Sequence, residues 1–162
     1  MKRYTLLIIA LALLFTGCGG DGTASTADVA NLTGLDITGS IIISSQDSHG
    51  GLNGDGELTI VYDCTKIRES VEAQMAESWN VLPLTDNLQM AMYGSTKDEV
   101  CYSDEPEDGN NIPRIDSGYY YFINRQDDSQ DDTFLFYSAS FNFILFLYDA
   151  DTARLYYYKL DT

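Results

Sequence analysis

The chain has 162 residues, with nine basic and 25 acidic residues, one histidine and a formal net charge of −16. So acidic a surface repels nucleic acid and anionic lipid headgroups, and we therefore expect no nucleic-acid partner. The single histidine and the three cysteines have no clustered spacing, which predicts neither a zinc site nor a Cys-x-x-Cys redox site. The acidity either keeps an aromatic-rich domain soluble or attracts a cation or a basic partner.

The N-terminus has the three-part layout of a secretory signal. Lys2 and Arg3 are followed by the apolar run Leu6–Phe15, and then by the small residues Thr16 and Gly17. A ten-residue helix spans about 15 Å, against roughly 30 Å of bilayer hydrocarbon. The run is therefore too short for a permanent transmembrane helix, and we expect an exported protein.

The end of this segment, Phe15-Thr16-Gly17-Cys18, resembles the lipobox of bacterial lipoproteins, with Phe15 where that pattern usually has leucine. The resemblance implies cleavage between Gly17 and Cys18, a diacylglyceryl group on the Cys18 thiol, and an acyl chain such as palmitate on the new amino group. Glycine at the second mature position favours the outer membrane under the sorting rule of enteric bacteria. The alternative is an ordinary cleaved signal that leaves Cys18 free or paired.

This organisation predicts three segments: a signal peptide over residues 1–17, an acylated Cys18 with a flexible tether over 18–34, and one globular domain over 35–162. The tether is small and polar, and a coil of that length spans roughly 20–24 Å. Cleavage removes Lys2 and Arg3 and no acidic residue, so nine basic residues become seven and the charge of −16 becomes −18. An oxidising compartment then favours a disulfide between the remaining cysteines, Cys64 and Cys101.

The globular part begins with two predicted strands. Ile41–Ser45 is β-branched, and Glu57–Asp63 alternates apolar and polar residues, so the pair forms a hairpin around a glycine-rich loop. The period then changes: apolar residues recur every four positions from Ile67 to Trp79, which predicts a helix over about 65–80. Two short strands are expected next, at Leu88–Tyr93 and Glu99–Ser103.

The last third carries most of the aromatic residues and predicts an antiparallel meander. Its strands are Tyr119–Asn124, the long segment Phe134–Tyr148 (as one strand or two) and Arg154–Leu160. Alternation between residues 135 and 147 predicts one buried face, and a second, partly apolar face with a polar notch at Ser138, Ser140 and Asn142. The fold class is therefore α+β, an antiparallel sheet of five to seven strands with one packed helix.

The catalytic and metal-binding motifs in the sequence are incomplete. Asp127, Ser129, Asp131 and Asp132 alternate as in the start of an EF-hand loop, but aspartate stands where that loop requires glycine and serine where it requires glutamate. His49 lies beside Ser48, without a Gly-x-Ser-x-Gly or Ser-x-x-Lys motif. We therefore assign no catalytic residue, no metal ligand and no cofactor besides the lipid.

Two tyrosine triplets are the candidate binding residues. They are Tyr119, Tyr120 and Tyr121, and Tyr156, Tyr157 and Tyr158. Because successive strand residues point to opposite faces, some of these rings are expected to face outward and to contact a partner protein or a glycan. Tyrosine is also simply a good strand former at half-buried positions.

The favoured function is non-enzymatic: a membrane-anchored lipoprotein that acts as a binding or envelope-assembly module in the periplasm or at the cell surface. A calcium-binding envelope domain and a small hydrolase of envelope polymers are the alternatives.

Overall fold

The computed structural model describes residues 25–50, 54–94, 112–137 and 140–162. The helices are α1 (Thr26–Thr33), α2 (Arg68–Ser78) and α3 (Asp86–Tyr93), with the short 3-10 helices η1 (Thr65–Ile67) and η2 (Leu135–Tyr137). The strands are β1 (Ile41–Asp47), β2 (Gly56–Asp63), β3 (Asn80–Val81), β4 (Gly118–Asn124), β5 (Phe143–Asp149) and β6 (Arg154–Asp161).

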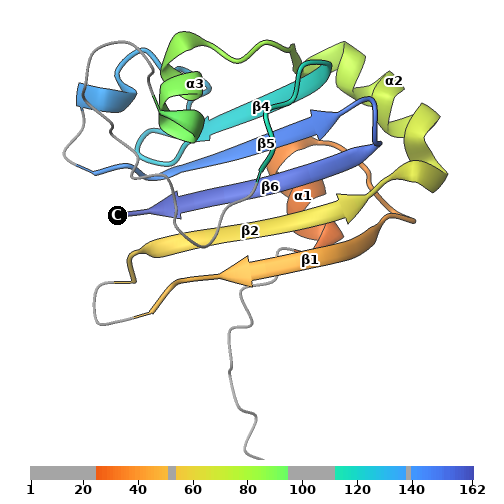
Figure 1. Cartoon of the computed structure of the whole chain (residues 1–162), viewed down its shortest axis with the longest axis horizontal. Coiled ribbons are helices and arrows are strands. Elements are labelled where there is room, and N and C mark those ends of the chain that lie inside the picture. Colours follow the sequence, from red (N-terminus) through yellow and green to blue (C-terminus); the bar gives the residue numbers. More distant parts are fainter. Residues whose placement is uncertain (1–24, 51–53, 95–111, 138–139) are drawn as a thin grey trace, which may run out of the picture.

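The six strands form one sheet in the order β1-β2-β6-β5-β4-β3, and every pairing is antiparallel. β1 and β2 form a hairpin, and β4, β5 and β6 form the predicted meander in the centre of the sheet (Figure 1). The predicted α+β class and the strand number are confirmed. β1 is one edge of the sheet and the two-residue β3 is the other.

Both faces of the sheet are buried over its central strands. On one face the buried side chains of β2, β5 and β6, among them Ile60, Phe146 and Tyr157, pack in one cluster with residues of α1 and α2. On the other face Phe122, Leu145 and their neighbours pack with residues of α3 and η2. The second face, which the sequence predicted to be partly apolar, is fully buried along β5, where Ile144, Phe146 and Tyr148 are buried as well.

The helix expected over 65–80 is confirmed as η1 followed by α2. Val71 and Met75 are fully buried in the core and Trp79 is nearly so, in agreement with the four-residue spacing. The helix ends at Ser78, because Trp79 already has an extended backbone and leads into β3.

The flexible tether over 18–34 is wrong in its second half. Residues 26–33 form α1, which begins with a capping box: the Ser25 hydroxyl accepts from the Asp28 N–H, and the Asp28 carboxylate accepts from the Ser25 N–H. Val29 is fully buried against the sheet. Among the described residues, the packed domain therefore begins at α1 rather than at Leu35.

One other strand prediction is wrong, and a second is confirmed only in part. Leu88–Tyr93 belongs to α3, where the Thr85 hydroxyl caps the first turn by accepting from the Leu88 N–H, and Leu88 is buried. The segment Phe134–Tyr148 is a strand only from Phe143 onward, since η2 interrupts its start. Glu99–Ser103 lies outside the described residues.

Candidate functional site

The tyrosine triplets do not form the exposed surface that the sequence suggested. They lie on β4 and β6 with β5 between them, so the triplets are not adjacent. Tyr120, Tyr156, Tyr157 and Tyr158 are buried. Tyr119 and Tyr121 are half-buried and pack on the core, with the Tyr121 ring 5.5 Å from that of Trp79. Helices on both faces of the sheet explain this burial.

The exposed aromatic residues lie elsewhere. Phe134 and Tyr137 are 65% and 85% exposed, and their ring centroids are 6.0 Å apart in an edge-to-face arrangement. They belong to the segment around η2, where the sequence predicted a strand with alternating burial. Two exposed rings make only a small surface. They do not lie on a strand, as the tyrosine triplets do.

β1 is exposed along its whole length, since all seven of its residues are exposed. Ile41, Ile42 and Ile43 are 51%, 44% and 49% exposed, in contrast to the buried apolar residues of the central strands. β1 pairs with β2 and with no other strand of the described residues, so one row of its backbone N–H and C=O groups faces outward. It forms the lower edge of the sheet in Figure 1.

The pairing of β1 with β2 is interrupted at Ile43. Ile42 lies opposite Tyr62 and Ser44 opposite Val61, so Ile43 is the extra residue of a bulge. Bulges and short lengths are devices that protect edge strands. β1 has the bulge, but it also has three consecutive isoleucines, which is unusual for a protected edge.

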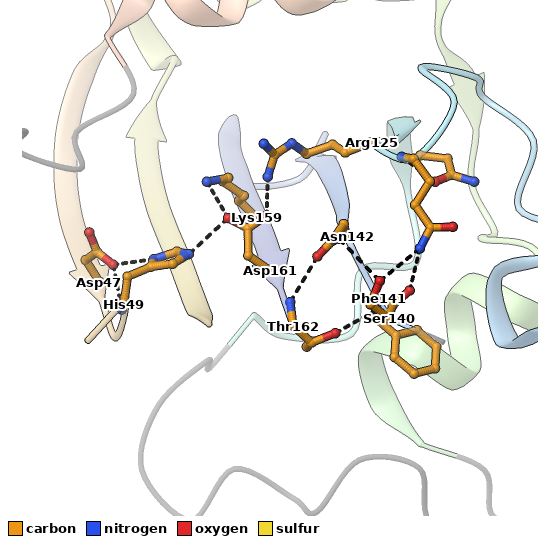
Figure 2. A network of polar contacts seen from close by, with 11 residues as sticks. Asp47, His49, Arg125, Ser140, Phe141, Asn142, Lys159, Asp161 and Thr162 are labelled. Atoms are coloured by element: carbon orange, nitrogen blue, oxygen red, sulfur yellow. Dashed lines mark hydrogen bonds and ion pairs between the residues drawn. The ribbon is translucent and has the colours of Figure 1, made fainter. Parts of the chain in front are cut away.

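A polar network fixes the end of β1 (Figure 2). The His49 Nδ1 lies 2.6 Å from Asp47 Oδ1, and the His49 Nε2 lies 3.2 Å from Asp161 Oδ2 at the end of β6. The imidazole thereby links the β1–β2 loop to a strand 112 residues further along the chain. Gly56 allows this, since a Cβ there would lie 2.6 Å from the His49 backbone.

Asp161 is the centre of this network. Its carboxylate contacts Lys159 Nζ at 2.5 Å, His49, and the Arg125 guanidinium of the loop after β4. Burial acts to raise the pKa of Asp161, but the hydrogen bond and charge of Lys159, the charge of Arg125 and the His49 hydrogen bond outweigh it and lower the pKa. The hydrogen bonds that His49 donates, first from its backbone, likewise lower the pKa of Asp47.

Two residues of the predicted polar notch, Ser140 and Asn142, lie next to this network. Gln126 Nε2 donates to the Ser140 carbonyl at 2.7 Å, and the Thr162 N–H donates to Asn142 Oδ1 at 2.9 Å. These bonds tie the loop after β4 and the end of β6 to the residues that precede β5 (Figure 2). Ser138 lies outside the described residues.

The network has the geometry of a structural clamp rather than of a catalytic group. Both His49 ring nitrogens contact carboxylate oxygens, so neither is directed at a nucleophile. The neighbouring Ser48 hydroxyl donates to the Glu57 carbonyl and accepts from the Glu57 N–H across the hairpin. Sequence reasoning missed this clamp because its partners are far apart along the chain.

The acidic turns use their oxygens locally. Asp127 accepts from the Ser129 N–H, Asp131 from the Thr133 N–H, and Asp149 from the Asp151 N–H. No three acidic, histidine or cysteine side chains gather as a metal site within the part of the chain that the structure describes.

The cysteines are only partly within the described residues. Cys64 is a buried, free thiol in the structure, and burial raises its pKa to about 11. Cys101, like Gly17 and Cys18, lies outside the described residues. The Cys64–Cys101 disulfide and the lipid attachment at Cys18 therefore remain predictions.

Comparisons with known proteins provide no family for this fold. No family model matches the chain, and no curated protein or solved structure matches it either. Within the described ranges, no helix combines the length and the apolar character needed to cross a bilayer.

Proposed function

We propose that this chain is a membrane-anchored lipoprotein that acts as a non-enzymatic binding module of the bacterial envelope, in the outer membrane. The lipobox-like residues Phe15–Cys18 support the anchor and the location. The exposed edge strand β1 supports the binding role and is the interaction surface in this proposal.

The observation that carries the proposal is the row of isoleucines Ile41–Ile43. Burying a whole isoleucine side chain stabilises an interface by about 1.5–3 kcal/mol, so covering the exposed half of each of these three contributes about 1 kcal/mol per residue. The chain is rich in charged residues, with 25 acidic residues in all, so three neighbouring isoleucines at an exposed edge stand out from its general composition. Large exposed apolar side chains gathered on one element favour a partner surface.

The test is a chemical cross-linking pull-down from native membranes. Three variants are compared with the parent protein: Cys18→Ala removes the anchor, Ile42→Lys adds a charge to β1, and Val81→Lys adds the same charge to the opposite edge, where Val81 is 69% exposed. We expect a reproducible partner that is lost with Cys18→Ala and Ile42→Lys and retained with Val81→Lys. A partner retained by Ile42→Lys contradicts β1 as the surface, and no partner in any sample contradicts the binding role.

The two alternatives have their own tests. A calcium-binding domain predicts a melting temperature that rises with calcium and falls with a chelator, and an unchanged value removes that candidate. A hydrolase of envelope polymers predicts release of soluble fragments from isolated envelope material. His49→Gln leaving fragment release intact would exclude the one histidine from that activity.

A further inference from the structure

We infer that the partner at β1 is an extended segment of a different protein that adds to the sheet as an antiparallel strand, with a polar, basic first half and an apolar, β-branched second half. This inference rests on the proposed binding function and specifies its partner.

The first argument is the chemistry of the edge. β1 is the outermost strand of the sheet among the described residues, and its seven residues are all exposed. A row of alternating N–H and C=O groups is complementary to another extended backbone and to little else. Antiparallel addition continues the pattern of the whole sheet, and it is slightly more stable per residue than parallel addition.

The second argument is the asymmetry of the strand. β1 reads Ile-Ile-Ile-Ser-Ser-Gln-Asp, so its first three residues are apolar and its last four are polar. Cross-strand pairs stabilise a sheet when apolar residues lie opposite apolar residues and opposite charges lie opposite each other. An antiparallel partner must therefore begin with a basic or polar residue opposite Asp47 and end with apolar residues opposite Ile41–Ile43.

The same asymmetry disfavours a second copy of this chain. If two β1 strands pair about Ser44 with two-fold symmetry, Ile41 lies opposite Asp47, Ile42 opposite Gln46, and Ile43 opposite Ser45. Each isoleucine is then placed against a polar residue. Two-fold pairing about Ile42 would instead place isoleucines opposite each other, but it leaves Ser44–Asp47 opposite residues 37–40, which lie before β1. Each copy also carries a net charge of −16, or −18 after the predicted cleavage, which opposes association, whereas a basic segment is attracted.

The negative charge of Asp47, at the polar end of β1, is available for an ion pair with such a segment. The lowered pKa of Asp47 keeps its carboxylate ionised at neutral pH, and its Oδ2 makes none of the contacts that Oδ1 makes with His49. Its side chain is 36% exposed. A lysine opposite Asp47 can therefore reach the carboxylate from the solvent side.

The probe is a synthetic peptide, Lys-Ser-Thr-Thr-Ile-Val-Ile, with the reversed sequence as a control of identical composition. Binding to the full chain is measured by fluorescence anisotropy, and amide hydrogen exchange of β1 and β3 is followed by NMR. We expect the peptide to bind and to slow exchange in β1 only. Ile42→Lys and the reversed peptide should each weaken binding by about tenfold or more, which corresponds to about 1.4 kcal/mol, and Val81→Lys should not.

Equal binding of both peptides, equal effects of both lysine variants, or no binding overturns strand addition. Slow exchange of the outward-facing N–H groups of β1, those not paired with β2, in the free protein overturns it too, since the edge is then already covered. Self-association in sedimentation that Ile42→Lys abolishes would identify a second copy as the occupant instead. The pull-down distinguishes failure of strand addition from failure of the proposed function. If a partner is lost with Ile42→Lys but the peptide does not bind, β1 remains the binding surface and only the addition of a strand is excluded.

Discussion

Asp161→Asn tests whether the His49–Asp161 clamp holds the end of β1 in place. The substitution keeps the size of the side chain but removes the charge that Lys159, Arg125 and His49 share. Hydrogen bonds to charged groups stabilise proteins by about 1.5–3 kcal/mol, and exposed ion pairs by about 0.2–1 kcal/mol. Because the Asp161 side chain is only 21% exposed, removing its charge should cost an amount in the lower half of the first range, about 2 kcal/mol.

The dependence on pH gives a second readout. The pKa of Asp161 is lowered in the folded state, so the unfolded chain takes up its proton first as the pH falls. The stabilisation is therefore fully present above the unfolded pKa of about 3.9 and is lost as the pH falls through the folded pKa. The difference between the parent protein and Asp161→Asn should be largest at pH 7 and should shrink below about pH 4.

The assay is urea unfolding at pH 7 and at pH 3, with amide exchange at the hairpin bonds between Ser48 and Glu57. Asp116→Asn, at an exposed position outside the clamp, controls for removing one negative charge from an acidic chain. We expect Asp161→Asn alone to lower the free energy of unfolding and to speed exchange at the hairpin. Equal effects of the two substitutions, or a difference independent of pH, would refute the reasoning.

Three further predictions concern the fold. Gly118→Ala should destabilise the protein by about 3 kcal/mol or more in urea unfolding, because its Cβ would lie 1.9 Å from the Tyr148 carbonyl oxygen at a φ of +144°; unchanged stability would contradict this close approach. Tyr148→Phe should cost about 1–2 kcal/mol by removing the hydrogen bond to Glu72 at 3.1 Å, and a neutral result would mean that this bond adds nothing to stability. Peptide mapping without reduction should recover a Cys64–Cys101 linked peptide from the exported protein, and two free thiols would exclude the disulfide.

Local patterns in the sequence predicted much of the fold. The four-residue spacing from Ile67 to Trp79 and the two-residue alternation of Glu57–Asp63 each depend only on neighbouring residues, and both elements are confirmed. α1 was missed although its capping box was present in the sequence, because its small polar residues are also typical of a tether. α3 was missed because a short apolar run fits a strand or a helix equally well.

The candidate site depended on contacts that local patterns do not encode. Whether the tyrosines of β4 and β6 are exposed is decided by the helices that cover each face, which come from other parts of the chain. The exposure of β1 likewise follows from its place at the end of the strand order. Its three isoleucines predicted a strand correctly, but only the sheet shows that they lie at an edge.

The most direct test of the central claim is a photo-activated cross-linker placed at position 42 of the full-length, membrane-anchored protein in cells, with position 81 as the control. If β1 receives a strand from another protein, irradiation should trap one reproducible adduct at position 42 and none at position 81, and the trapped peptide should have a basic first half and an apolar second half. No adduct at position 42, or the same adducts at both positions, would contradict β1 as the binding edge.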